Sequence, residues 1–139
     1  MSVLHQASCV AIGGRALLIE GPPGSGKSSL ALALIDRGAV LIGDDGIMLE
    51  LRAGRLYASP APQIAGLLEV RNLGLLSYPC AAGVPAALIV RLDPAAPRFI
   101  EQAEPVNFGG VILPAVQLWP GGEVLAIKAE LAMTHYGMA

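Results

Sequence analysis

Residues 21–28 read Gly-Pro-Pro-Gly-Ser-Gly-Lys-Ser, and this stretch decides how the rest of the sequence is interpreted. It matches the pattern G-x-x-x-x-G-K-[ST], in which the backbone N–H groups of a glycine-rich turn surround phosphate oxygens. The apolar-leaning run 16–20 precedes it, and the apolar-rich run 29–37 follows it and ends at Gly38. The predicted order is therefore strand, turn and helix, which is the context that a phosphate-binding loop requires. The alternative is an ordinary glycine-rich turn before a helix, for which the complete pattern would be a rare accident.

The residue types of this loop indicate how each part would bind a nucleoside triphosphate. Its glycines allow backbone angles that are closed to other residues, and the helix that begins near Lys27 adds a positive N-terminal end. The Lys27 side chain can reach the β- and γ-phosphates, and the Ser28 hydroxyl can bind Mg²⁺. The expected nucleotide-binding residues are Gly21, Pro22, Pro23, Gly24, Ser25, Gly26, Lys27, Ser28 and Ser29.

Length and composition predict one α/β domain that covers residues 1–139. The apolar fraction is 54% and charged residues make up 14%, which is typical of a largely buried sheet flanked by helices. The net charge is −2 and no basic run is present, so we expect no nucleic-acid partner. The N-terminus has no signal-peptide pattern, and the apolar runs are shorter than a membrane span. We therefore expect a cytoplasmic protein without a membrane partner; Cys9 and Cys80 predict neither a zinc site nor a disulfide framework.

Asp44 and Asp45 form the second candidate group. They follow the apolar run 39–42, which reads as an interior strand of a parallel sheet. The carboxyl end of that strand should lie at the same edge of the sheet as the glycine-rich loop. One carboxylate could then join a metal shell, and the other could take a proton from an attacking hydroxyl group. The alternative is a plain Asp-Asp-Gly turn, and the presence of the loop favours the functional interpretation.

A few isolated charges are further candidates. Glu69 and Arg71 stand two apart in the apolar run 64–76, and on a strand they would share one face. They would form either a salt-bridged strand or a Mg²⁺ carboxylate beside a phosphate-facing cation. Arg98 is another candidate for a phosphate-facing cation, with a solvated surface arginine as the equal alternative. His5 becomes a candidate only if the fold returns it to the phosphates.

The hydrophobic pattern predicts the remaining elements with less functional content. Expected are hairpins at 7–12/15–19 and 47–51/55–58, a buried strand at 86–90, an edge strand or extended segment at 111–118 that contains Pro114, and a helix at 123–136 that buries Leu125, Ala129 and Ala132.

Together these motifs resemble the catalytic domain of HPr kinase/phosphorylase, the bacterial enzyme that phosphorylates a serine of the phosphocarrier protein HPr. The resemblance runs from about His5 to the C-terminal helix. It rests on the loop, on Leu-Ile-Gly-Asp-Asp at 41–45, and on Leu-Glu-Val-Arg-Asn-Leu-Gly-Leu-Leu at 68–76, which is similar to the family's signature segment. It implies a P-loop α/β core of mixed or parallel sheet with flanking helices, related to that of phosphoenolpyruvate carboxykinase.

The resemblance also implies roles for single residues. Lys27 would contact the transferring phosphate of ATP, while Ser28 and Glu69 would hold Mg²⁺. Asp44 remains the further candidate for the metal shell, and Asp45 would be the base that accepts the serine proton. The reaction would be in-line phosphoryl transfer from Mg·ATP to a serine of an HPr-like partner, with a regulatory role in the phosphotransferase system.

Further implications concern the outer parts of the chain. His5 matches a family histidine that orients or supports the base, and Arg98 matches a later catalytic arginine. The resemblance implies a homo-oligomer, since family members form hexamers, and the short proteobacterial form that lacks an N-terminal domain. Residues 117–122 contain no Lys or Arg near the place of a basic segment tied to the reverse reaction. Kinase activity is therefore expected rather than phosphorylase activity.

Two other functions remain open at this point. A small-molecule P-loop kinase would use the same loop, although such enzymes usually carry an arginine-rich lid that this sequence lacks. A nucleotide-sensing regulator would bind ATP tightly and transfer nothing. Incubation with ATP and either HPr or small alcohols would separate these alternatives.

Overall fold

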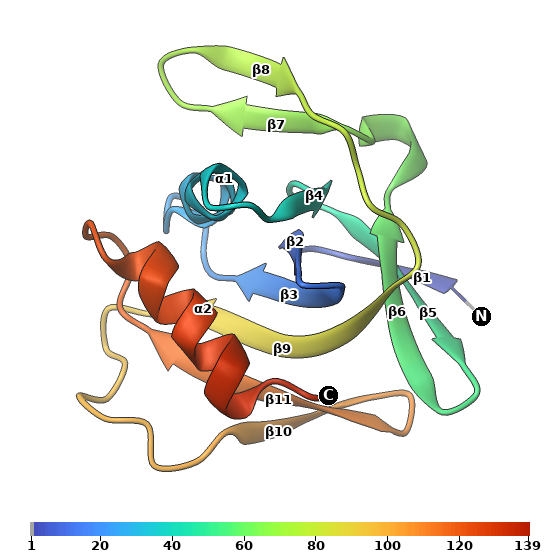
Figure 1. The fold of residues 1–139 in the computed structure, drawn as a ribbon, viewed down its shortest axis with the longest axis vertical. Coiled ribbons are helices and arrows are strands. Elements are labelled where there is room, and N and C mark those ends of the chain that lie inside the picture. Colours follow the sequence, from blue (N-terminus) through green and yellow to red (C-terminus); the bar gives the residue numbers. More distant parts are fainter. Residues whose placement is uncertain (1) are drawn as a thin grey trace.

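A mixed β-sheet with only two α-helices forms the fold in the computed structural model, which describes residues 2–139. Figure 1 shows α1 and α2 beside the sheet, and a separate hairpin standing apart from it. The elements in chain order are β1 (Ser2–His5), β2 (Ser8–Ile12), β3 (Arg15–Glu20), α1 (Lys27–Asp36), β4 (Val40–Gly43), β5 (Ile47–Arg52), β6 (Arg55–Pro60), a short 3₁₀ turn (Pro62–Ile64), β7 (Leu67–Val70), β8 (Gly74–Ser77), β9 (Val84–Leu92), β10 (Glu104–Phe108), β11 (Val111–Leu118) and α2 (Leu125–Tyr136).

The strand order places the glycine-rich turn at the centre of the sheet. Nine strands form the main sheet in the order β1-β5-β6-β9-β3-β2-β4, with β11 joined to β9 and β10 joined to β11. Strand β3 pairs parallel with β9 and antiparallel with β2. Strand β4 pairs antiparallel with β2 and therefore runs in the same direction as β3. The carboxyl ends of β3 and β4 consequently lie at one edge of the sheet, as expected from the sequence.

The core occupies both faces of this sheet, and β3 shows how the sequence divides between them. Leu17 and Ile19 are fully buried in the cluster that includes the apolar residues of α1 and α2. Ala16 and Leu18 are fully buried in a second cluster, formed with strands such as β5, β6 and β11. Because successive strand side chains point to opposite faces, a continuous apolar run is what a strand buried on both faces requires.

Strand β4 corrects one prediction. It is the terminal strand of its sheet path rather than an interior parallel strand, and Val40 is 42% exposed. Its only parallel contact is an isolated bridge between Leu41 and Cys80, within the part of the chain that the structure describes. Leu41 and Ile42 pack into the clusters on opposite faces. An apolar run in a sequence indicates that both faces of the strand are buried. It does not indicate whether both edges of the strand are paired with neighbouring strands.

The predicted edge strand at 111–118 is also wrong, since β11 pairs with β10 on one side and β9 on the other. Pro114 lies opposite Pro105 in the register of β10 and β11. Neither residue has an N–H group, so this pair occupies a position that exchanges no backbone hydrogen bonds. A proline is tolerated there without an exposed edge. Strands β1, β8 and β10, which are short and largely exposed, were missing from the prediction.

Other elements agree with the sequence. The β2–β3 and β5–β6 hairpins form at the predicted places, although β6 continues to Pro60. Helix α2 begins at Leu125, and Leu125, Ala129 and Ala132 are buried as expected.

Cys9 is fully buried, and burial raises the pKa of its thiol. None of the helices in residues 2–139 is long and apolar enough to cross a membrane.

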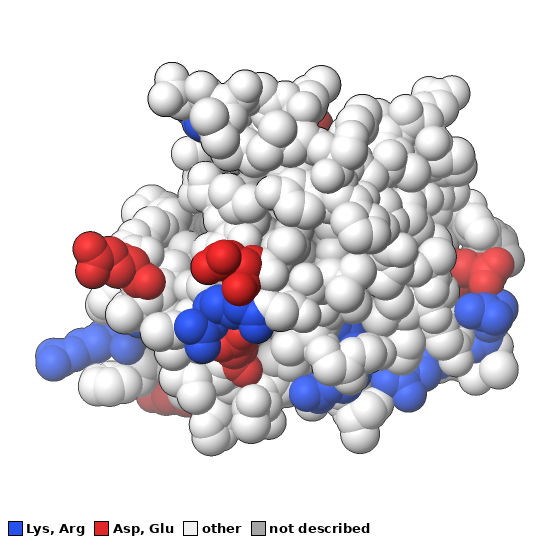
Figure 2. All heavy atoms as spheres, turned by 45° about the horizontal axis from the view of Figure 1, so that its top comes forward, with Lys and Arg blue, Asp and Glu red and all other residues white. Residues whose placement is uncertain are grey.

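The surface carries few charges. In the view of Figure 2 the upper half is almost free of Lys, Arg, Asp and Glu, and the charged side chains gather in the lower half. The β7–β8 hairpin exposes apolar side chains, with Leu73 73% and Leu75 67% exposed.

Candidate active site

The glycine-rich loop, residues 21–26, connects the end of β3 to the start of α1. Gly24 and Gly26 have φ angles of 79° and 96°, in the left-handed region that favours glycine. Gly26 is the N-cap of α1, and no side chain caps that end of the helix. The first N–H groups of α1 are therefore left without a side-chain acceptor, and the positive end of the helix suits an anion.

Gly21 and Ser25 show how tightly the loop is built. A Cβ atom at Gly21 would lie 2.5 Å from Ser25 Oγ and 3.3 Å from the carbonyl oxygen of Leu92, so a larger residue there would require Ser25 to move. Ser25 Oγ is buried and has no hydrogen-bond partner. An unpaired buried hydroxyl group is costly, and a phosphate oxygen bound in the loop would supply the missing partner.

Lys27 lies over its own loop. Its Nζ atom donates a hydrogen bond to the carbonyl oxygen of Gly21 at 2.7 Å and contacts that of Pro22 at 3.4 Å. The amine therefore stays at the mouth of the loop, where a triphosphate would lie.

Asp44 joins three segments at the carboxyl end of β4. Its Oδ1 atom accepts hydrogen bonds from Ser8 Oγ at 2.8 Å and Ser28 Oγ at 2.6 Å. Its Oδ2 atom accepts one from the backbone N–H of Glu69 at 3.1 Å. Asp44 is only 8% exposed. This carboxylate thus links β2, α1 and β7, and it fixes the position of Ser28.

Replacement of Asp44 by Ala is expected to lower the free energy of unfolding by about 2–4 kcal/mol, because three donors lose their acceptor and Ser8 is fully buried. Urea denaturation of both proteins measures this difference. Asp36→Ala, at the exposed end of α1, is the matched control and should change it by less than about 0.5 kcal/mol. A loss below about 1 kcal/mol in Asp44→Ala would show that other groups satisfy the donors.

Asp45 lies between two hollows. Its φ angle is 62°, and its side chain is exposed. One hollow, of about 160 Å³, is lined by the loop together with Asp45, Glu69 and Arg71. The other, of about 470 Å³, is lined by Asp45, Lys27, His5 and neighbouring residues. The glycine-rich loop and the aspartate pair, far apart in sequence, are therefore brought together.

Glu69 and Arg71 reach the smaller hollow in a way that differs from the prediction. Glu69 lies on β7, but Arg71 follows the end of β7 in the turn where Asn72 has a φ angle of 71°. The two side chains therefore do not share a strand face, and no ion pair joins them among the described residues. The sequence did not show that this apolar run turns back after Val70 to form the β7–β8 hairpin.

The oxygen atoms at this place fit a Mg²⁺ ion. Ser28 and Glu69 line the smaller hollow, and their hydroxyl and carboxylate oxygens are hard ligands, which Mg²⁺ prefers. Asp44 lies behind them, with both carboxylate oxygens engaged by the donors of Ser8, Ser28 and Glu69. No three His, Cys, Asp or Glu side chains of residues 2–139 converge into a closed metal site.

His5 belongs to a charged cluster that the sequence did not reveal. Its Nε2 atom lies 2.7 Å from Glu20 Oε2, and Glu20 Oε1 accepts a hydrogen bond from Arg91 Nε at 3.1 Å. Burial acts to raise the pKa of Glu20, but the hydrogen bonds and charges of His5 and Arg91 outweigh burial and lower it. Glu20 and Arg91 are register partners on β3 and β9. The sequence shows opposite charges at the ends of two apolar strands. It does not show that these two strands pair.

The lowered pKa of Glu20 predicts a pH-dependent contribution to stability. A depressed carboxyl pKa stabilises the fold above the unfolded value, about 4.3, and this contribution is lost as the pH falls through the folded value. Glu20→Gln should lower the free energy of unfolding by about 1–2 kcal/mol at pH 7. Urea denaturation from pH 3 to 7 should show this difference shrinking below about pH 4.3. A difference that grows toward low pH would contradict the assignment.

Arg98 does not reach the glycine-rich loop. It lies in the segment between β9 and β10, and its guanidinium carbon is 5.4 Å from the ring centroid of Phe99. It lines a separate hollow with Trp119 and Lys128. The segment after β9 packs toward α2, since the Tyr136 hydroxyl group donates a hydrogen bond to the carbonyl oxygen of Ile100 at 3.1 Å. Arg98 thus lines neither of the two hollows that Asp45 lines, and its catalytic role stays a prediction.

The fold as a whole is shared with a solved structure. The Hpr(Ser) kinase/phosphatase from Coxiella burnetii matches with a TM-score of 0.84, covering 96% of this chain and 95% of the other. The two sequences are 23% identical, so this similarity defines the fold class and no more. This chain and the Coxiella burnetii protein therefore share one fold, a mixed sheet with few helices.

The sequence comparison then defines the family. The HPr Serine kinase C-terminal domain profile matches residues 2–87, and the chain belongs to this family. It is 35% identical over 141 residues to the HPr kinase/phosphorylase of Limosilactobacillus reuteri, covering 91% of this chain and 44% of the relative. It is 48% identical over 64 residues to that of Bordetella pertussis, covering 45% and 21%. The chain spans less than half the length of these curated relatives.

Proposed function

We propose that this chain transfers the γ-phosphoryl group of Mg·ATP to a serine hydroxyl of an HPr-like phosphocarrier protein, as a regulatory kinase. Membership of the HPr Serine kinase C-terminal domain family supports the substrate class, and relatives named HPr kinase/phosphorylase support the reaction type. The absence of Lys and Arg from residues 117–122 favours the kinase direction over the phosphorylase direction.

One observation carries the proposal. Three segments that are distant in sequence line one hollow: the glycine-rich loop, Asp45, and the β7 segment with Glu69 and Arg71. Asp44 holds them together through its hydrogen bonds with Ser28 Oγ and the backbone of Glu69. The groups proposed to bind phosphate, to bind the metal and to accept the proton therefore lie around one hollow, which supports phosphoryl transfer.

The residues divide the work as follows. The loop N–H groups, which Pro22 and Pro23 lack, surround the phosphates together with that of Ser29, and Lys27 and Arg71 neutralise their charge. Ser28 and Glu69 would hold Mg²⁺, with Asp44 as the further candidate, and the ion would supply further charge neutralisation when bound. Arg71 takes the part expected of Arg98, because it lines the hollow.

Asp45 is proposed as the proton acceptor. It removes the proton of the serine hydroxyl as the serine oxygen bonds to the γ-phosphorus. The bond from that phosphorus to the bridging oxygen breaks on the opposite side, and ADP leaves with the electron pair. His5 lines the hollow on the other side of Asp45 and supports its position.

The test is direct. The pure chain is incubated with γ-labelled ATP, Mg²⁺ and the HPr paralogues of its own genome, and the modified residue is mapped by mass spectrometry. The expected result is label on a single serine of one paralogue, dependent on Mg²⁺. Label on small alcohols but not on protein would replace the proposal with a small-molecule kinase. Tight ATP binding without any labelled product would replace it with a nucleotide-sensing regulator.

A further inference from the structure

A cluster of four ionisable side chains runs from the hollow of about 470 Å³ to a separate cavity that Arg91 and Glu104 line. It consists of His5 at the end of β1, Glu20 at the end of β3, Arg91 on β9 and Glu104 on β10. The successive contacts are 2.7 Å between His5 and Glu20, 3.1 Å between Glu20 and Arg91, and 2.9 Å between Arg91 and Glu104. We propose that Glu20 is a positioning residue, which fixes the His5 ring for the reaction and is itself held by Arg91. This inference rests on the proposed function.

The contact with Glu20 fixes the ring chemically. The carboxylate of Glu20 can only accept a hydrogen bond, so the proton of a neutral His5 ring is held on Nε2. Nδ1 is then the nitrogen that remains free to accept a proton or a hydrogen bond. Glu20 thereby decides which nitrogen of His5 can act.

The ring is also fixed sterically. Phe108 packs against it edge to face, with centroids 5.3 Å apart and an interplanar angle of 82°. The His5 side chain is 25% exposed and that of Glu20 is 19% exposed. A ring held by a carboxylate on one side and an aromatic ring on another has little rotational freedom, which is the property that a positioned catalytic group requires.

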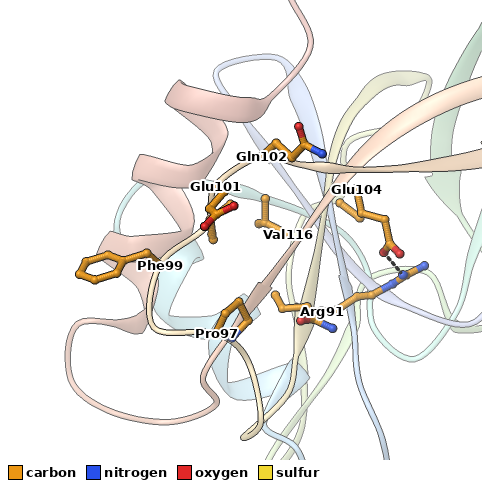
Figure 3. Close-up of a pocket in the computed structure, with 10 residues that line it drawn as sticks. Arg91, Pro97, Phe99, Glu101, Gln102, Glu104 and Val116 are labelled. Atoms are coloured by element: carbon orange, nitrogen blue, oxygen red, sulfur yellow. Dashed lines mark hydrogen bonds and ion pairs between the residues drawn. The ribbon is translucent and has the colours of Figure 1, made fainter.

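Arg91 completes the arrangement from the opposite side. Figure 3 shows its side chain reaching Glu104 at the margin of a cavity of about 420 Å³. Glu104 has a 63% exposed side chain, so its contact with Arg91 is open to water. Glu20 is the more buried partner, and two donors hold its carboxylate from opposite sides. Glu20 is thus the member of the cluster whose orientation is fixed.

The location gives this cluster a functional role beyond holding strands together. His5, Glu20, Lys27 and Asp45 line the same hollow of about 470 Å³. Glu20 directly precedes Gly21, whose carbonyl oxygen binds Lys27 Nζ. A change in Glu20 is therefore expected to alter the His5 ring without removing any group that contacts phosphate.

The first experiment follows the ring itself and needs no activity. The full chain is labelled with ¹⁵N-histidine, and its ring protons are observed at about pH 8.5, where an unperturbed imidazole is neutral. The chain contains only two histidines, and exposed His135 on α2 is an internal reference. The expected result is a slowly exchanging Nε2 proton on His5 that is lost in Glu20→Ala, which removes the acceptor, and retained in Glu20→Asp. A ring proton unchanged in Glu20→Ala would overturn the proposal.

The second experiment measures transfer to HPr. Glu20→Gln is expected to lower kcat about ten- to a hundredfold, the range of one hydrogen bond to a charged group, with KM for ATP unchanged. In a His5→Gln background the same change should have no further effect, since the two residues act as one unit. Glu20→Asp should recover most of the loss because it restores a carboxylate.

A matched control separates positioning from general loss of an ion pair. Glu130→Gln removes the partner of Arg37, a 2.8 Å pair between α1 and α2 that lies outside the charged cluster. It should leave kcat and the His5 proton unchanged. An equal loss of kcat from Glu20→Gln with and without His5 would overturn the proposal. If the wild-type chain labels no HPr, the proposed function fails, and the ring-proton experiment alone decides whether Glu20 positions His5.

Discussion

Lys27→Ala is expected to reduce phosphoryl transfer by at least about a thousandfold while the chain remains folded, since fixed positive charge at the phosphates is the main catalytic contribution in such enzymes. The amine of Lys27 lies at the mouth of the glycine-rich loop, held by the carbonyl oxygen of Gly21 at 2.7 Å. Alanine is a good helix former and suits the first residue of α1. The loss should therefore appear in transfer and in ATP affinity, with little change in thermal stability. Labelled-ATP transfer, calorimetric binding and thermal denaturation measure the three quantities.

The chain offers a matched control for this change. Lys27 and Lys128 are its only lysines, and Lys128 is exposed on α2 beside the ring of Trp119. Lys128→Ala removes the same charge outside the hollow and should leave transfer unchanged. Transfer that survives in Lys27→Ala, or that falls equally in both variants, would contradict the assignment of the loop as the phosphate site.

Asp45→Asn should lose transfer by about a hundred- to ten-thousandfold and keep ATP binding, because the amide cannot accept the serine proton. Asparagine suits the position for a structural reason. Asp45 has a φ angle of 62°, and Asn tolerates the left-handed region where Ala would be strained. The substitution therefore changes the chemistry of the side chain and leaves the turn intact. Calorimetry of ATP binding and mass spectrometry of HPr measure the two effects.

Asp36→Asn provides the control for Asp45→Asn, because it makes the same change at the exposed end of α1 and should leave transfer unaffected. Retained phosphorylation of HPr by Asp45→Asn would remove Asp45 from the role of base. Loss of ATP binding together with transfer would place Asp45 among the nucleotide-binding groups instead.

Local patterns predicted the parts of this protein that depend on neighbouring residues. The loop, α1, Gly38 with its φ angle of 106°, and the two hairpins follow from glycine placement and apolar spacing. These features need little information from distant parts of the chain. The loop motif predicted the position of the candidate site. The common direction of β3 and β4 then placed Asp44 at the same edge of the sheet as the loop.

The errors arose where distant segments decide the outcome. Strand β4 is buried on both faces, so its apolar run looks like that of an interior strand although one of its edges lacks a full partner strand. Arg71 left the expected strand face because the chain turns back at Asn72. Arg98 lines a different hollow, in a segment that Tyr136 of α2 contacts at Ile100, and no local pattern shows this. The contact between His5 and Glu20 depends on the relative positions of β1 and β3, which the order of strands sets and no local pattern records.

The β7–β8 hairpin links the integrity of the hydrophobic core to the assembly of the reaction centre. Two isolated strands are marginally stable in water. This pair is held to the rest of the protein by two adjacent residues of β7, one through the core and the other through a hydrogen bond. Leu68 is fully buried beside α1, while the backbone of Glu69 is tied to Asp44. Withdrawal of Leu68 would release both the hairpin and the carboxylate beside the phosphates. We therefore expect that opening of this hairpin disassembles the hollow, and that a ligand which binds only the closed hairpin shifts the opening equilibrium toward the closed form by mass action.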